Sequence, residues 1–383
     1  GFLKKYISPL LICDTNTCKV TEDIMEDIYD RCQVLVLDAE ELHADQHAIK
    51  IVENNMEEDI DLILAVGTGT IHDISRYMAF QYKIPFISVP TAASVDGFVS
   101  TVAAMTWNGL KKTIPAVPPI AVYADSNIFA DAPARLNASG VSDLLGKYIC
   151  LVDWKIAHML TDEYICDEII KLEEKAMRTV RSCLADISEG DKESCEKLMY
   201  ALILSGLATQ MAGNSRPASC AEHQLSHLWE LEVLNGPLDA LHGEMVSVGT
   251  MIVLREYKRV ARAIREGRCS VRTQWEDDTE LLEKTFGSRG FFEGIVEENT
   301  PEPLLKISPA RLEACLDEIA GLIEELPEEE ELARMMDRAG CKRSVYEIGL
   351  SEEMIPQSLK LAPYVRRRLS FLRILRMLRI EGE

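Results

Sequence analysis

The chain of 383 residues has no long apolar run, no paired cysteine spacing and no surplus of positive charge. Without an apolar run that could span a bilayer, and without a signal peptide, we expect no stable membrane insertion. Eleven scattered cysteines with no CxxC pair argue against a structural zinc site and are typical of reduced thiols in a cytoplasmic protein. A formal net charge of −22 leaves no broad basic face for nucleic acid.

The first part of the sequence alternates short apolar runs with amphipathic stretches, a pattern typical of βαβ units. At 47% apolar residues, a chain of this length can bury two domain cores. The sequence begins almost inside its first expected strand, so we expect a segment before it to be missing. The expected strands cover 10–14, 34–39, 62–66, 86–90 and 121–125, the expected helices 21–32, 41–55 and 70–82, and a β-hairpin over 101–117 turns at Asn108-Gly109.

The second part has helical periodicity and almost no strand-like alternation. We therefore predict a nucleotide-binding α/β domain over 1–135 and an all-helical domain over 136–383. The basic, amphipathic end of the chain, 364–379, is expected to pack on that domain as a last helix. The other expected helices cover 144–160, 168–185, 192–212, 220–233, 243–266, 308–325 and 328–339.

A glycine turn indicates where a dinucleotide would bind. Gly67 and Gly69 follow a buried strand and precede a helix, so the backbone can approach a pyrophosphate at the helix N-terminus. The spacing G-x-G-x-x-x-D is not the Rossmann fingerprint, and Asp73 could simply stabilise the first helical turn. We expect His72 to face solvent or the cofactor phosphate, without a catalytic role.

Two further segments carry polar groups suited to a cofactor or a polyol. Asp14 ends the first strand, where its carboxylate can accept hydrogen bonds from ribose hydroxyls. The segment PTAASVDGFVS (90–100) follows a later strand with several hydroxyl side chains. Asp96 within it could hold a polyol.

Three distant residues have the chemistry of a divalent metal site. Asp143, His223 and His242 are borderline ligands that leave coordination positions open, which suits Zn²⁺, Ni²⁺ or Fe²⁺. Spacing alone does not assemble them, and the nucleotide-binding pattern upstream is what favours the combination. We expect Asp143 near a helix start. His227 lies one helical turn after His223, where it could bind a substrate hydroxyl or pack as a supporting residue.

Taken in order, CDTNT, GTGTIHD, PTAASVDGF, GVSDLLGK, SRPASCAEHQLSHLWE and LHGEMV resemble the dehydroquinate synthase-like superfamily. Within it the chain is most similar to bacterial sn-glycerol-1-phosphate dehydrogenases, relatives of the glycerol dehydrogenases and iron-containing alcohol dehydrogenases. The resemblance implies a dehydroquinate synthase-like fold that binds NAD(P)H and one divalent metal ion, and a homodimer or larger homo-oligomer. It implies cofactor contacts from Asp14, Gly69, Thr70, Ile71, His72, Asp73, Thr91, Ala92, Ala93, Ser94 and Ser100, metal ligation by Asp143, His223 and His242, and substrate contacts or catalysis by Asp96, Asp143 and His227.

The reaction implied is reversible reduction of dihydroxyacetone phosphate to sn-glycerol 1-phosphate, with the metal as Lewis acid on the ketone oxygen. A glycerol or polyol dehydrogenase, a sugar-phosphate cyclase of the dehydroquinate synthase kind and a non-catalytic NAD-binding protein remain alternatives. A phosphorylated substrate needs cations in so acidic a protein. The candidates are Lys111, Lys112, Lys147 and Arg216.

Overall fold

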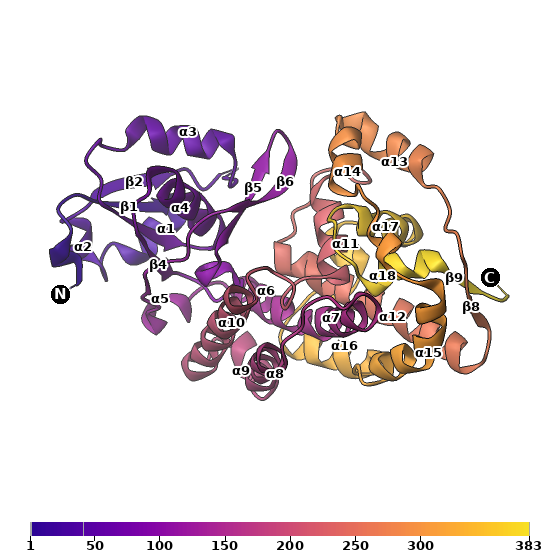
Figure 1. Ribbon diagram of the computed structural model, residues 1–383. Helices are drawn as coiled ribbons and strands as arrows, with labels where there is room; N and C mark the ends of the chain where they lie inside the picture. Colours follow the sequence, from indigo (N-terminus) through magenta and orange to yellow (C-terminus); the bar gives the residue numbers. More distant parts are fainter. Residues whose placement is uncertain (1, 41, 383) are drawn as a thin grey trace. The chain divides into compact units, whose positions relative to one another are not determined.

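The computed structural model describes residues 2–40 and 42–382 (Figure 1), with the side chains of Phe2, Leu110 and Lys111 left out. Its contacts divide the chain into two compact units. Unit 1 comprises Gly1–Val141 and Arg178–Gly213, and unit 2 comprises Ser142–Met177 and Asn214–Glu383. The predicted division at 135/136 treats each domain as one continuous segment, whereas here the segment Arg178–Gly213 returns to unit 1.

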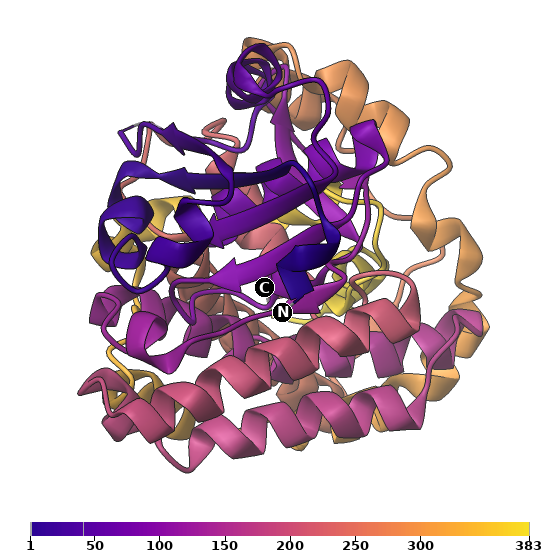
Figure 2. The same cartoon turned by 90° about the vertical axis from the view of Figure 1, so that its left-hand side faces the viewer.

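Unit 1 is built on a parallel sheet whose strand order is β2-β1-β3-β4-β7. All five expected strands are present. Figure 2 shows the sheet from the side of this unit, with neighbouring strands rotated in the usual twist. The strand bounds are β1 Pro9–Asp14, β2 Gln33–Leu37, β3 Leu62–Gly67, β4 Phe86–Pro90 and β7 Ala121–Val122.

Alternate residues of the central strands enter two separate cores, because successive side chains of a strand point to opposite faces. Leu10 and Ile63 pack with helices α3 (Gln46–Asn55) and α4 (Gly69–Tyr82). Leu11 and Leu64 pack instead against the segment of α1 (Thr15–Thr21) and α2 (Glu26–Tyr29). Helices on both faces explain why these strands are apolar throughout.

The predicted hairpin is confirmed as β5 (Val102–Trp107) paired antiparallel with β6 (Leu110–Pro115). Asn108 and Gly109 have φ of 53° and 79°, the left-handed values that a two-residue hairpin turn needs. Unit 1 also holds η2 (Gly97–Val99), α5 (Ser126–Phe129), α9 (Leu184–Ser188) and α10 (Lys192–Ala212). A Cβ on Gly206 of α10 would lie 2.6 Å from the carbonyl oxygen of Asp96, so a glycine is needed for this close approach.

Unit 2 is helical around α12 (His242–Arg265), which packs against α11 (Ala221–Glu230), α15 (Pro309–Glu324) and α16 (Glu329–Arg338). The helix expected at 144–160 corresponds mainly to α7 (Lys147–Thr161), and a separate helix that was not expected, α6 (Ala134–Leu145), ends before Gly146. Asp143 therefore lies near a helix end, not a helix start. The remaining α-helices that begin in this unit are α8 (Asp167–Arg181), α13 (Thr279–Phe286), α14 (Phe292–Glu298) and α17 (Ile355–Leu361).

The end of the chain packs into unit 2, as expected, but not as one helix. Segment 364–379 forms a short helix α18 (Phe371–Ile374), a turn and the strand β9 (Leu378–Ile380), which pairs with β8 (Cys269–Val271). Arg373 is fully buried and donates to Glu302 and to the carbonyl of Pro363, which a helix with one solvated face would not allow. No helix in the described residues is long and apolar enough to cross a membrane.

Candidate functional site

The glycine turn lies at the carboxyl end of β3, as the sequence predicts. A Cβ on Gly67 would lie 2.7 Å from Cβ of Ile71, so the turn needs a residue without a side chain. Thr91 after β4 donates its backbone N–H to the Gly67 carbonyl at 3.1 Å, which fixes the two strand ends side by side. Thr68 is the N-cap of α4 and makes no side-chain capping bond. The N-terminus of α4 thus lies beside the segment that begins at Thr91.

His72 corrects one expectation. Its ring is buried, with Nδ1 2.8 Å from the Thr68 carbonyl and Nε2 2.7 Å from the Ser88 hydroxyl, and so does not face solvent or a phosphate. Burial lowers the pKa of His72 to about 3, although the Thr68 carbonyl acts in the opposite direction. The neutral imidazole ties the start of α4 to β4.

Arg76, which was not predicted from the sequence, positions the segment from Gly97 to Val102. Its buried guanidinium donates to the carbonyl oxygens of Gly97 at 2.6 Å and Val102 at 3.3 Å, and pairs with Asp73 at 2.8 Å. Asp73 is therefore the counterion of a buried arginine. The i,i+3 spacing of the two residues was the available signal.

The other predicted contacts of unit 1 are partly engaged in local structure. Asp14 is the N-cap of α1 and accepts the N–H groups of Asn16 and Thr17 at 2.9 Å. Ser100 bonds to both backbone groups of Val102. Asp96 accepts the hydroxyl of Ser205 on α10 at 2.8 Å. The predicted contacts Thr91, Ala92, Ala93 and Ser94 form one buried stretch.

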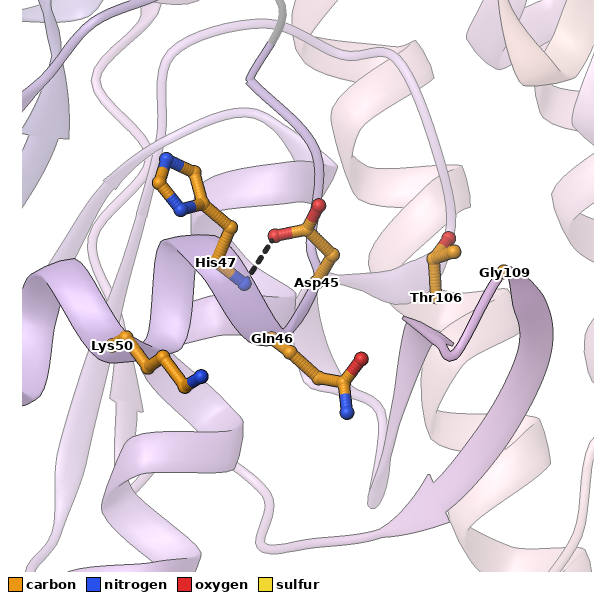
Figure 3. Close-up of a pocket in the computed structure, with 6 residues that line it drawn as sticks. All are labelled: Asp45, Gln46, His47, Lys50, Thr106 and Gly109. Carbon is orange, nitrogen blue, oxygen red and sulfur yellow. Dashed lines mark hydrogen bonds between the residues drawn. The ribbon is translucent and has the colours of Figure 1, made fainter.

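A pocket of about 420 Å³ lies elsewhere in unit 1 (Figure 3). Asp45, Gln46, His47 and Lys50 border it from the start of α3, and Thr106 and Gly109 from the hairpin. None of the predicted site residues lines it.

In unit 2 the predicted metal residues come together around a buried carboxylate. Asp143 is 2% exposed, and its Oδ1 lies 3.0 Å from Nζ of Lys147 and 3.4 Å from Nε2 of His223. Burial alone would raise the pKa of Asp143, but the charges of Lys147 and His223 hold it well below its usual value. The carboxylate is ionised, as a metal ligand must be.

Three histidine rings converge beside it. The ring centroids of His223 and His242 are 5.3 Å apart, and that of His227 lies 5.6 Å from His242 and 6.0 Å from His223. His227 is 7% exposed, its Nδ1 has no hydrogen-bond partner, and burial followed by the charge of Arg366 lowers its pKa well below the usual value. The arrangement places a neutral imidazole with a free nitrogen beside the other two rings.

Two glutamates of α11 contact the Nδ1 atoms of His223 and His242. Nδ1 of His223 lies 2.7 Å from Glu222, and Nδ1 of His242 lies 2.7 Å from Glu230. Burial would lower the pKa of His223, but Asp143 and Glu222 raise it above its usual value. Glu230 was missed from the sequence. Its partner His242 lies on another helix, so no local spacing indicated the contact.

The donor set fits a divalent ion. Two ligands at about 2.1 Å from a tetrahedral ion stand about 3.4 Å apart, and the His223 nitrogen and the Asp143 oxygen are separated by that distance. Donor atoms of His227, Glu230 and His242 lie within 4.8 Å of one another, and the predicted set of Asp143, His223 and His242 is not brought together as tightly. This group and the pair of His223 and Asp143 each combine imidazole and carboxylate, which suits Zn²⁺, Ni²⁺ or Fe²⁺.

The cations suggested for a substrate phosphate differ in their burial and in their partners. Lys147 is fully buried between Asp143 and the carbonyl of Ala218, and Arg216 is 3% exposed and bonded to Glu163 and Leu369. Both side chains are engaged inside unit 2, which argues against these two candidates for a substrate phosphate. Lys112 is exposed on the hairpin of unit 1, and the side chain of Lys111 lies outside the described part.

The fold and a match to a family model indicate the class of proteins that the chain resembles. Residues 4–133 match the model of the family "Iron-containing alcohol dehydrogenase". A crystal structure of an iron-containing alcohol dehydrogenase superposes with a TM-score of 0.61, covering 98% of this chain and 91% of that one, at 14% identity. This likeness concerns the fold.

The sequence comparison is more specific. Glycerol-1-phosphate dehydrogenase [NAD(P)+] of Geobacillus stearothermophilus is 34% identical over 95% of this chain and 85% of the relative. The enzyme of the same name from Geobacillus thermodenitrificans is 34% identical over 88% of this chain and 77% of the relative. The chain belongs to the glycerol-1-phosphate dehydrogenase family.

Proposed function

We propose that this protein catalyses the reversible, NAD(P)H-linked and metal-dependent reduction of dihydroxyacetone phosphate to sn-glycerol 1-phosphate. The observation that carries the proposal is the convergence of Asp143, His223, His227 and His242 in unit 2 of a chain whose relatives bear that activity in their names. The eleven cysteines form no disulfide, which agrees with a reducing, cytoplasmic setting.

Asp143, His223 and His242 would hold the divalent ion, Zn²⁺, Ni²⁺ or Fe²⁺. When bound, the ion supplies Lewis acidity at the ketone oxygen. Asp143 contributes a full negative charge, because Lys147 keeps it ionised despite burial. His227 is left with an uncommitted nitrogen, which can donate to or accept from a substrate hydroxyl.

Unit 1 would contribute the cofactor contacts. The free amides at the start of α4, from Gly69 onward, would bind the pyrophosphate, and the buried stretch Thr91–Ser94 would border the rest of the cofactor. Asp14 and Ser100 remain proposed cofactor contacts, and Asp96 a proposed substrate contact. Each has oxygen acceptors suited to ribose or polyol hydroxyls.

Arg366 is our candidate for the substrate phosphate in place of Lys147 and Arg216. It follows the turn η7 (Ala362–Tyr364), which packs on α11. It is half-buried, and among the described residues the carboxylates of Glu230 and Glu298 act on its charge without forming an ion pair within 4.0 Å. Burial lowers its pKa to about 10, so it stays charged at neutral pH, and its charge acts on His227. An unpaired guanidinium near the substrate histidine suits a phosphate.

The test is NADH oxidation by metal-stripped protein with Zn²⁺, Ni²⁺ or Fe²⁺ and either dihydroxyacetone phosphate or dihydroxyacetone. We expect metal-dependent turnover of the phosphorylated ketone alone. Arg366→Met should raise KM for that substrate about tenfold or more, whereas Arg367→Met, at the exposed neighbouring position, should not. Turnover of dihydroxyacetone instead would indicate a polyol dehydrogenase, and no turnover of either ketone would reject the proposal.

A further inference from the structure

Of the three converging histidines, two are held by a carboxylate and one is not. Oε1 of Glu222 lies 2.7 Å from Nδ1 of His223, and Oε1 of Glu230 lies 2.7 Å from Nδ1 of His242. Nδ1 of His227 is buried without a partner. The two glutamates lie in the first turn and at the last residue of α11, and their side chains are 0% and 10% exposed.

The contact decides which nitrogen of each ring carries the proton. A carboxylate accepts only, so the nitrogen facing it must be the N–H, and the lone pair is then on Nε2. For His223, Nε2 lies 3.4 Å from Asp143, on the side away from Glu222, and its lone pair becomes available when a metal ion takes the place of a proton between these two atoms. Each glutamate therefore directs a metal-binding lone pair away from itself, and for His223 this direction is toward Asp143.

Each glutamate is itself held in place. Oε1 of Glu222 accepts the backbone N–H of Cys220 at 2.9 Å, and Oε1 of Glu230 accepts the hydroxyl of Ser226 at 3.5 Å. A carboxylate fixed in this way also raises the basicity of the imidazole it contacts. His227 lacks such a partner, which separates it from the two proposed ligands.

We infer that Glu222 and Glu230 are positioning residues of the metal site, each fixing the tautomer and orientation of one ligand histidine. The inference rests on the proposed metal site and assigns no contact between either glutamate and the ion. The competing assignment makes Glu230 a direct ligand, because its carboxylate and donor atoms of His227 and His242 lie within 4.8 Å of one another.

The experiment measures Zn²⁺ affinity by competition with a chelator, using Zn²⁺ alone and no substrate. Glu230→Ala removes the acceptor, and Glu230→Gln keeps a carbonyl oxygen that can accept from Nδ1–H. Glu232→Ala is the matched control, since Glu232 follows the same helix and pairs with Arg289 at 3.2 Å. For the fully buried Glu222 the isosteric Glu222→Gln is used, so that folding is preserved.

We expect Glu230→Ala to weaken Zn²⁺ binding about 10- to 100-fold. Glu230→Gln should recover most of that loss, Glu222→Gln should bind within a few-fold of wild type, and Glu232→Ala should match wild type. Unchanged affinity in Glu230→Ala would overturn the inference. Loss of binding in both Glu230 variants would do so as well, because it would make Glu230 a ligand.

Histidine ¹⁵N spectra of the metal-free protein give a readout that does not depend on metal. With seven histidines, the rings can be assigned individually. Wild type should show His242, which has a carboxylate on one nitrogen only, as the Nδ1–H tautomer, and Glu230→Ala should change His242 alone. If wild type binds no metal, the proposed function fails. If it binds metal but shows His242 as the Nε2–H tautomer, only the present inference fails.

Discussion

The variant Lys147→Met tests whether the buried ion pair of Asp143 and Lys147 stabilises unit 2. Nζ of Lys147 lies 3.0 Å from Asp143 and 2.9 Å from the Ala218 carbonyl, and neither charged side chain is more than 2% exposed. Methionine keeps most of the volume but removes the charge, so a buried carboxylate loses its main counterion. Removing one partner of a buried ion pair typically costs about 3–5 kcal/mol.

For a domain of the size of unit 2, each kcal/mol corresponds to about 2–4 °C in Tm. We therefore expect Lys147→Met to lower the midpoint of metal-free protein by roughly 6–20 °C. Thermal unfolding followed by circular dichroism or calorimetry measures the shift. The matched control is Lys171→Met on α8, where the lysine pairs with Glu168 at 2.7 Å but is 64% exposed.

The control should stay close to wild type, because solvent screens an exposed pair. A shift for Lys147→Met no larger than that of Lys171→Met would refute the reasoning that the Asp143–Lys147 pair is desolvated. The direction in which stability changes with pH gives a second check. Because the pKa of Asp143 is depressed in the folded protein, its carboxylate stabilises the fold above the pKa that it has in the unfolded chain. This stabilisation is lost as the pH falls. Asp143→Asn should weaken that acid dependence.

Three further predictions concern the two units. The pKa of His72 is about 3 in the folded protein against 6.5 for a free histidine. Protonation of His72 in the unfolded chain should therefore lower the free energy of unfolding by about 2 kcal/mol at pH 5. Urea unfolding should show a smaller difference in stability between pH 7 and pH 5 for His72→Gln than for wild type. Gly140→Ala would place Cβ 2.1 Å from the Ala93 carbonyl oxygen and should weaken NADH binding about tenfold by fluorescence titration, whereas Gly236→Ala, with nothing within 4 Å, should not. His227→Asn should lower kcat about 10²-fold while Zn²⁺ affinity stays near that of wild type, and a parallel loss of metal would instead make His227 a ligand.

Local patterns were sufficient for the strands of unit 1, but the helix expected over 21–32 is replaced by α1 (Thr15–Thr21) and the short α2 (Glu26–Tyr29). The apolar runs predicted all five parallel strands because both faces of the sheet are covered, and Asn108-Gly109 predicted the hairpin because its φ values are specific to such residues. Helix bounds were accurate where periodicity was long, as in α10 and α12. The break at Gly146 was missed, because apolar residues continue on both sides of it.

The sequence by itself determined the class of fold, the glycine turn and the residue types of the metal site, because these depend on short motifs and their order. Tertiary structure alone decided which charges are available. It buried Lys147 against Asp143 and Arg216 against Glu163, turned His72 inward, and brought Glu230 to His242 across twelve residues. Burial and ion pairing depend on which elements pack together, and no local pattern of residues records that.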